Sequence, residues 1–314
     1  MICFGPIQSR RLGISLGINN IISPKVCSYG CIYCQVGFTH RKSTDRESFF
    51  QPEVIFSKVE QHIQQLSKDK YPDYLTFVSN GEPTLDINLG KSIKLLKKLE
   101  IPIAVISNAS LLENESVQKD LKLADWVSLK MDAGDSDTWK KVNQPAPGLN
   151  FESLINNINL FAASYKGLLR TETMLIKGIN DSIENITTLS ELIEKINPGK
   201  AYLAIPIRPP ASSSVKAPDT EILNLAWQIY SNKNIKTEFL TGFEGIDNGF
   251  TGNIYDDILN ITSVHPLRED SLLELLKNNH ADIQVVTSLL QQRLIKTTKY
   301  NGNKYYIREY HHTS

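Results

Sequence analysis

The feature that most constrains the fold is a regular alternation of apolar runs and amphipathic stretches between residues 12 and 240. Apolar runs rich in branched residues predict strands at 12–18, 74–83, 101–108, 126–133, 168–181, 200–210 and 235–240. Helical periodicity between these runs predicts helices at 52–67, 88–98, 150–164, 183–195 and 219–231. Strand–helix alternation is typical of a parallel sheet. The sequence therefore predicts an α/β fold with a partial (β/α)6 TIM-like barrel, whose chemistry lies on the loops that follow the strands.

The pattern changes after a glycine-rich stretch at 241–253. Beyond it, the periodicity predicts short helices at 254–262, 269–278 and 282–293. Two strand-like runs, LIKTTKY and KYYIREY, follow and are joined by Asn301 and Gly302, which is a strong hairpin signal. Three helices and a hairpin suggest a winged helix. We therefore expect a core domain at 1–250 and a small C-terminal winged-helix-like domain at 251–314.

Composition narrows the functional classes. The 314 residues include 34 Lys plus Arg and 34 Asp plus Glu, so net charge gives no indication of a nucleic-acid, membrane or acidic partner. The chain has no run of about 18 apolar residues and no signal-peptide pattern at its start, so we expect no membrane association. There are four cysteines, and three of them are clustered. This usage indicates a reducing, cytoplasmic location and a metal site rather than a disulfide framework.

The clustered cysteines lie in the segment CSYGCIYC at 27–34. Thiolates bind soft metals, which leaves zinc and iron–sulfur as candidates. A structural zinc site needs four ligands, and only Cys3 or His40 could complete one. Cys3 lies in an apolar segment, and His40 stands beside two cationic residues. A 4Fe–4S cluster normally takes four thiolates, so three would leave one iron open to a small molecule.

This segment resembles the signature of the radical S-adenosylmethionine (SAM) superfamily, Cys-x3-Cys-x-aromatic-Cys, with Tyr33 at the aromatic position. The resemblance implies that Cys27, Cys31 and Cys34 bind one 4Fe–4S cluster and that SAM binds the open iron. An electron from the reduced cluster would cleave SAM to methionine and a 5′-deoxyadenosyl radical. It also implies an external one-electron donor of the flavodoxin or ferredoxin type.

Further residues are assigned to the SAM site by this resemblance. Gly81 and Glu82 lie in an NGEP segment that is either a simple turn or the segment that holds the methionyl amino group. Ser128, Lys130 and Asp132 share one face of a strand. A buried lysine there needs an anionic partner, and the SAM carboxylate would supply one. The resemblance assigns Lys130 to that carboxylate, Ser128 and Asp132 to the ribose, and Gly178 to the adenine. Asn108 either contacts the cofactor or substrate or caps the next helix.

Three arginines are candidates for contact with the substrate. Arg10 and Arg11 either clamp a phosphate or carboxylate or form a solvated pair before a strand. Arg170 shares a strand face with Glu172, so it forms either an ion pair inside the barrel or a substrate contact. His265, in the segment VHPLRED, either caps a helix or joins the two domains, or it takes part in catalysis.

Several segments together resemble the stand-alone wyosine-synthetase-like subfamily, among them FGPIQSRRLGISLGIN, SNGEPTL, VSLKMDA, MLIKGIND, IPIRPP and VHPLRED. True tRNA wyosine synthases carry a second cluster with three more cysteines, whereas this chain has only Cys3 to spare. A second cluster is therefore excluded, which argues against the wyosine route itself.

Three hypotheses for the function follow. The first is a radical SAM enzyme that acts on RNA or another nucleotide-containing substrate. The second is a radical activase or maturase that acts on a protein or peptide. The third is an iron–sulfur redox sensor whose winged helix binds DNA. The helix at 282–293 contains a single arginine, and Lys296, Lys299 and Lys304 on the hairpin add a modest basic footprint. A role in dimerisation or docking fits the C-terminal domain equally well.

Overall fold

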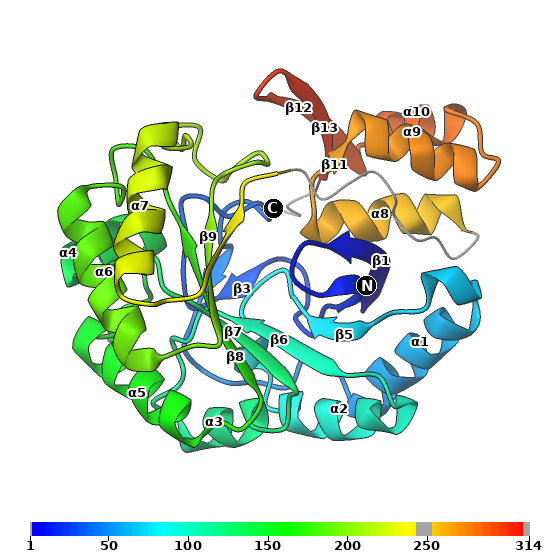
Figure 1. Ribbon diagram of the computed structural model, residues 1–314. Helices are drawn as coiled ribbons and strands as arrows, with labels where there is room; N and C mark the ends of the chain where they lie inside the picture. The colour runs from blue at the N-terminus through cyan, green and yellow to red at the C-terminus, as the bar shows by residue number, and fades with distance from the viewer. Residues whose placement is uncertain (1, 243–252, 310–314) are drawn as a thin grey trace.

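The computed structural model describes residues 2–242 and 253–309. Its main feature is an open, curled sheet of eight strands in the order β1-β2-β5-β6-β7-β8-β9-β10 (Figure 1). The strands are β1 Cys3–Ser9, β2 Gly13–Ile18, β5 Tyr74–Phe77, β6 Ile103–Ser107, β7 Trp126–Lys130, β8 Leu168–Met174, β9 Lys200–Ala204 and β10 Thr237–Leu240. All neighbours from β2 to β10 are parallel, whereas β1 is antiparallel to β2. The carboxyl ends of seven strands therefore meet at one edge.

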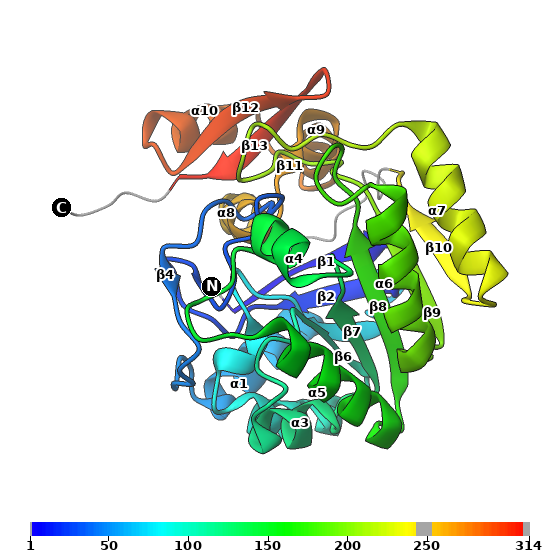
Figure 2. The ribbon, with the colours of Figure 1, turned by 90° about the vertical axis from the view of Figure 1, so that its left-hand side faces the viewer.

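Helices cover the outer face of this sheet, and Figures 1 and 2 show them around its convex side. They are α1 Pro52–Gln64, α2 Leu89–Leu96, α3 Glu115–Leu121, α4 Ser136–Asn143, α5 Phe151–Ser164, α6 Ile183–Ile196 and α7 Thr220–Asn232. Three 3-10 turns, η1 Lys68–Lys70, η2 Pro83–Leu85 and η3 Lys97–Leu99, lie between them. A two-stranded pair, β3 Val26–Cys27 and β4 Arg41–Lys42, flanks the cysteine segment.

All seven strands that the sequence predicted for the parallel sheet are present. The runs at 74–83, 168–181 and 200–210 each end in a loop, and the strands themselves stop at Phe77, Met174 and Ala204. The sequence missed β1, whose segment contains a proline, and it missed α3 and α4. These two helices have only seven and eight residues, which is too short for a periodic pattern to stand out.

The C-terminal residues form a separate small unit beside β1. It contains α8 Ile254–Val264, β11 Leu267–Arg268, α9 Glu269–Asn278, α10 Gln284–Gln291, β12 Ile295–Tyr300 and β13 Asn303–Arg308. The three strands form a sheet in the order β11-β13-β12, and the helices pack an apolar cluster of their own against it. Asn301 and Gly302 both have positive φ, as the Asn-Gly hairpin prediction requires. The winged-helix assignment itself stays a prediction, and most of the glycine-rich stretch before it lies outside the described residues.

The C-terminal unit contacts the barrel at defined points. α8 packs beside β1 (Figure 1). The hydroxyl groups of Tyr300 and Tyr305 donate hydrogen bonds of 3.1 Å each to the carbonyl oxygens of Pro206 and Ile207, in the loop after β9. The hairpin therefore supports a loop at the carboxyl edge of the barrel.

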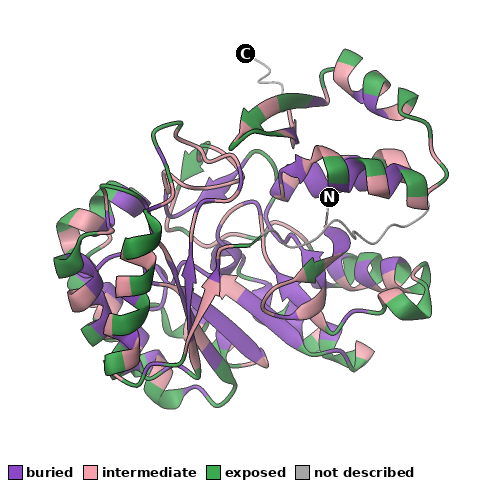
Figure 3. Ribbon diagram, turned by 45° about the horizontal axis from the view of Figure 1, so that its top comes forward, coloured by how far each residue is buried: buried purple, intermediate pink, exposed green. Residues whose placement is uncertain are grey.

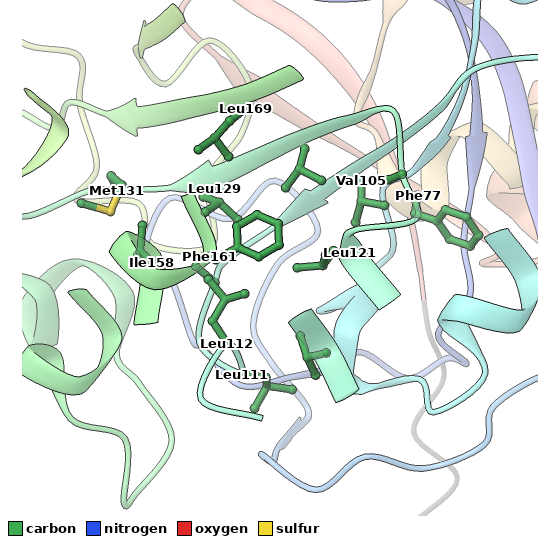
Figure 4. Close-up of a cluster of buried hydrophobic side chains, with 14 of the residues drawn as sticks. Phe77, Val105, Leu111, Leu112, Leu121, Leu129, Met131, Ile158, Phe161 and Leu169 are labelled. Carbon is green, nitrogen blue, oxygen red and sulfur yellow. The ribbon is translucent and has the colours of Figure 1, made fainter. Parts of the chain in front are cut away.

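The main core lies between the sheet and its helices. Side chains on alternate strand residues, such as Val105 and Leu129, face helix residues such as Leu121 and Phe161 (Figure 4). Figure 3 shows the same division along the helices, with buried faces toward the sheet and exposed faces outward. Because residues two apart share a face, Ser128 and Lys130 lie on the other side of the sheet from Leu129. Among the described residues, no helix is long and apolar enough to cross a membrane.

Truncation of Phe161 on α5 tests this core. Phe161 is fully buried and stacks on Tyr165 with ring centroids 5.0 Å apart. We expect Phe161→Ala to lower the free energy of unfolding by about 3–5 kcal/mol, because it removes apolar contacts and leaves a cavity. Leu160→Ala, at the neighbouring residue with a 55% exposed side chain, is the matched control and should change it by under about 0.5 kcal/mol. Equal effects in urea denaturation would contradict this packing.

Candidate functional site

The predicted residues converge on a cavity of about 220 Å³ at the carboxyl ends of the strands. Its walls are the cysteine segment, the loops after β5, β6 and β9, and the ends of β7 and β8. Ten of the residues predicted from the sequence line it: Arg10, Arg11, Cys27, Cys31, Tyr33, Cys34, Gly81, Glu82, Asn108 and Lys130. Segments more than a hundred residues apart in the chain thus form one site.

Each of the three cavity cysteines has a nitrogen donor beside its sulfur. The ammonium of Lys25 lies 3.0 Å from Sγ of Cys34. The amide nitrogen of Asn143 lies 3.4 Å from Sγ of Cys31, and that of Asn108 lies 3.7 Å from Sγ of Cys27. Hydrogen bonds to sulfur ligands stabilise thiolates and tune the potential of iron–sulfur clusters. The donors therefore suit thiolates that bind such a cluster.

The thiols differ in acidity. Burial raises the pKa of Cys27 to about 12, and burial also raises that of Cys31. Burial acts in the same direction on Cys34, but the neighbouring Lys25 ammonium outweighs it and lowers the pKa of this thiol. Cys34 is therefore the thiol most easily deprotonated. Binding of iron at the other two would release their protons.

The cysteines fit a cluster better than they fit one ion. Among residues 2–242 and 253–309, no group of three His, Cys, Asp or Glu side chains is placed to hold a single metal ion. A 4Fe–4S cluster does not require such convergence, because each thiolate binds a different iron. Cys3 lies away from this cavity, with its sulfur 3.5 Å from Nδ1 of His62.

Asp132 fastens the cysteine segment to the sheet. One of its oxygens accepts hydrogen bonds from the Tyr33 hydroxyl at 2.5 Å and from the Asn143 amide at 2.7 Å. The other oxygen accepts from the backbone N–H of Met174 at 2.8 Å. Burial raises the pKa of Asp132. Both carboxylate oxygens are occupied within the chain, and Asp132 is not among the residues that line the cavity.

Glu82 joins the loops after β5 and β6. Its carboxylate accepts hydrogen bonds from the Ser107 hydroxyl at 2.7 Å and from the Asn108 backbone N–H at 2.8 Å. The backbone and hydroxyl of Thr84 add two more on the same oxygen as Ser107. Burial raises the pKa of Glu82, so a nearby cation would stabilise its ionised form. The oxygen that faces Asn108 keeps capacity for a further donor.

Gly81 is required by close approach. A Cβ at this position would lie 1.8 Å from the carbonyl oxygen of Val26, the residue before Cys27. The neighbouring Asn80 is buried, and its amide donates to the Ser23 hydroxyl at 3.0 Å. The loop after β5 therefore packs directly against the start of the cysteine segment.

Lys130 has an anionic partner within the chain, in addition to the SAM carboxylate that the resemblance assigns to it. Its ammonium forms an ion pair with Glu172, and Arg11 forms a second ion pair with the same carboxylate. Burial would raise the pKa of Glu172, but Arg11 and Lys130 outweigh it and lower this pKa to about 2. The carboxylate is thus ionised between two cations at the edge of the cavity.

Four predicted site residues lie outside the cavity lining: Ser128, Asp132, Arg170 and Gly178. Ser128 is fully buried deeper in the barrel. Arg170 lies near the start of β8, where its guanidinium donates to the carbonyl of Leu169, and its predicted partner Glu172 pairs with other residues. Gly178 has φ of +70° in a turn where its backbone N–H donates to Asp181, a conformation that favours glycine. Their cofactor and substrate roles stay predictions.

Sequence reasoning missed four residues of this region. Lys25 and Asn143 hydrogen-bond to cysteines of the cavity, and Asn143 ends a helix that was not predicted. Gln35 and Arg208 line the cavity and contact each other, with an Arg208 guanidinium nitrogen 3.0 Å from the Gln35 side-chain oxygen. The available signal for Arg208 was its position at the carboxyl end of the run at 200–210.

Comparison with known proteins agrees with this geometry. The model of the radical SAM superfamily matches residues 21–189. The chain therefore belongs to the radical SAM superfamily and is a radical SAM enzyme. It is 42% identical to the UPF0026 protein MJ1312 of Methanocaldococcus jannaschii, over 98% of this chain and 96% of that protein.

Two further similarities are more distant. The chain is 26% identical to a protein named "Probable dual-specificity RNA methyltransferase RlmN" from Shouchella clausii, over 60% of this chain and 53% of that protein. Its fold resembles the solved structure of TYW1 with a lysine-pyruvate adduct bound, with a TM-score of 0.52 and 17% identity. That match covers 95% of this chain and 82% of TYW1. It confirms the expected fold resemblance to the wyosine synthetase.

Adding one methyl group at Gly81 tests the contact between the loop after β5 and the start of the cysteine segment. We expect Gly81→Ala to displace the start of the cysteine segment and to reduce the iron and sulfide bound after anaerobic reconstitution by at least about half, since real Cβ atoms do not approach a carbonyl oxygen this closely. Gly242→Ala is the control, because a Cβ there meets no atom of the described residues within 4 Å. Full iron and sulfide content in Gly81→Ala would show that the contact does not matter.

The ion pairs of Glu172 predict a pH dependence. Its folded-state pKa of about 2 is below the usual value of 4.5, so its contribution to stability is complete above about pH 4.5 and is lost as pH falls toward 2. We expect wild type to be more stable than Glu172→Gln at neutral pH, with a difference that shrinks below about pH 4.5. Urea denaturation at several pH values measures it. The exposed Glu115→Gln is the control, and a difference that does not change with pH would refute the pairing.

Proposed function

We propose that this enzyme binds one 4Fe–4S cluster at Cys27, Cys31 and Cys34 and cleaves SAM reductively. The superfamily implies both groups. The observation that carries the assignment is the convergence of three thiols and their nitrogen donors on the cavity at the carboxyl edge. When bound, the cluster and SAM together supply a 5′-deoxyadenosyl radical, with methionine as the second product of sulfonium cleavage.

The residues of this chain orient these groups. Lys25, Asn108 and Asn143 would stabilise the thiolates through the contacts described above. The Glu82 carboxylate, which faces the cavity, is suited to hold the SAM ammonium. Tyr33 is fixed by Asp132, so its ring offers a rigid wall beside Lys130, whose ammonium lies 5.9 Å from the ring centroid.

Lys130 is proposed to share its charge between Glu172 and the SAM carboxylate. An ammonium has three donors, so one ion pair leaves capacity for a second anion. Ser128 and Asp132 are candidates for contact with the ribose, and Gly178 for contact with the adenine. These three residues do not line the cavity, so each contact would require the residue to move toward it.

We propose RNA or a nucleotide-containing molecule as the substrate. A relative bears the name of an RNA methyltransferase, and Arg10 and Arg11 place positive charge in the cavity wall. A protein or peptide, as for an activase or maturase, is the second candidate. The one-electron donor is proposed to be of the flavodoxin or ferredoxin type.

The contacts of the C-terminal unit favour the hypothesis of an enzyme over that of a DNA-binding redox sensor. If it acted as a DNA-binding winged helix, we would expect its hairpin to be available as a wing. Instead, Tyr300 and Tyr305 at the hairpin donate to the loop that lines the cavity. We propose that the winged-helix-like unit helps to shape the substrate site.

Formation of 5′-deoxyadenosine tests the proposal. We expect anaerobically reconstituted wild type, given dithionite and SAM, to produce it, with RNA added in a parallel reaction to look for acceleration. Cys27→Ala, Cys31→Ala and Cys34→Ala should each lose product and most bound iron and sulfide, because each thiolate anchors a separate iron. Cys3→Ala should retain both, since Cys3 does not line the cavity. Loss of the cluster in Cys3→Ala, or cleavage by Cys34→Ala, would overturn the ligand assignment.

A further inference from the structure

Lys25 is a buried lysine at the start of the cysteine segment. It lies two residues before Cys27, and only 7% of its surface is exposed. Its ammonium lies 3.0 Å from Sγ of Cys34 and donates to the carbonyl oxygen of Gly37 at 2.8 Å. One side chain thus connects the start of the segment to its last cysteine and to the turn that follows.

No carboxylate neutralises this ammonium. Among residues 2–242 and 253–309, Lys25 forms no ion pair with an aspartate or glutamate. Lys130 and Arg11, by contrast, both pair with Glu172. A buried charge is costly unless it is paired. The group in contact with Lys25 that can become anionic is the thiol of Cys34.

Lys25 acts on the cysteines from outside the main cavity. Cys27, Cys31 and Cys34 line that cavity, whereas Lys25 does not. Its ammonium therefore contacts a cysteine sulfur without forming part of the wall that would face SAM or a substrate. Lys130 differs in this respect, because it does line the cavity.

A fixed positive charge at this position changes the energy of reduction. Under the proposed function, a low-potential donor loses one electron and the cluster gains it, with no proton transferred. The reduced cluster carries one more negative charge than the oxidised one, so a nearby cation stabilises the reduced form more. Water and salt screen this attraction little at a buried residue. Thiolates beside Lys25 stabilise its protonated form in turn.

We propose that Lys25 is the counter-ion of the cluster and that its charge raises the reduction potential of the cluster, which makes reduction by the donor easier. This inference rests on the proposed function, because it requires a 4Fe–4S cluster at the three cysteines. It goes beyond that function by naming the residue that adjusts the electron-transfer step. Lys25 acts through the sulfur of Cys34 and would touch neither SAM nor substrate, so it is not a catalytic residue.

The midpoint potential of the cluster tests this role. It is measured on anaerobically reconstituted protein without SAM, by a redox titration that follows the electron paramagnetic resonance signal of the reduced cluster. We expect Lys25→Met to make one-electron reduction about tenfold less favourable or more, which lowers the midpoint potential by about 59 mV or more. Lys25→Arg keeps the charge, so its potential should lie closer to wild type than to Lys25→Met.

Two further variants separate the charge from the hydrogen bond and from general electrostatics. Lys25→Gln keeps a donor for the sulfur but removes the charge, so its potential should lie well below that of Lys25→Arg. Lys42→Met is the matched control. Lys42 lies opposite Cys27 in the register of β3 and β4, but it is exposed, so water and salt screen its charge. We expect Lys42→Met to change the reduction equilibrium by less than about twofold.

A purely structural role of Lys25 would give a different result. Its variants would lose iron and sulfide or unfold at a lower temperature, and those that kept the cluster would keep the wild-type potential. Equal potentials in wild type and Lys25→Met, or equal shifts in Lys25→Met and Lys42→Met, overturn the proposal. If Lys25→Met binds no cluster, a lower potential in Lys25→Gln than in Lys25→Arg supports the role of the charge, and equal potentials refute it. Loss of the cluster from all three Lys25 variants would show that the residue only shapes the segment.

These measurements distinguish failure of this inference from failure of the proposed function. If the potential shifts as expected but wild type forms no 5′-deoxyadenosine from SAM, the role of Lys25 stands and the radical chemistry fails. If 5′-deoxyadenosine forms but Lys25→Met keeps the wild-type potential, the radical function stands and Lys25 does not act on the potential. Absence of iron and sulfide from reconstituted wild type overturns both.

Discussion

The site depends on the hydrogen bonds that the carboxylate of Asp132 accepts. It joins Tyr33 of the cysteine segment, Asn143 at the end of α4 and the backbone at the end of β8. Asn143 in turn contacts the sulfur of Cys31. A buried carboxylate left without these donors would be costly, so the cysteine segment is stabilised in one position on the sheet. The position of the cysteines therefore depends on this hydrogen-bond network as well as on their spacing in the sequence.

Charged side chains line the main cavity. Glu82 lies in the loop after β5, and the carboxylate of Glu172 lies between Lys130 and Arg11. Under the proposed function, this arrangement suits a cofactor with an ammonium and a carboxylate, with the ammonium near Glu82 and the carboxylate near Lys130.

The sequence predicted the features that depend on local pattern. Period and composition located the parallel strands, and the cysteine spacing located the centre of the site, because both are properties of adjacent residues. The ion pairs of Glu172 could not be predicted, since its carboxylate on β8 is reached by Lys130 from β7 and by Arg11 from the segment after β1. Asn143 was missed for the same reason: an asparagine has no local signature, and its role depends on which strand ends and loops become neighbours. Ser128 shares the strand face of Lys130, but it lies two residues deeper and is fully buried, so a shared face did not imply a shared cavity.

The position of the C-terminal unit bears on the proposed function. In a radical SAM enzyme the radical chemistry belongs to the cofactors, so the barrel alone determines little about what is attacked. Here the loop after β9, which carries Arg208, accepts hydrogen bonds from Tyr300 and Tyr305, and Gln35 links the cysteine segment to the end of α8. A change in the C-terminal unit would therefore move a cavity wall without altering the cysteines. Under the proposed function, the elements that shape the substrate site and the cysteines that would hold the cluster are thus separate, and they meet at Gln35.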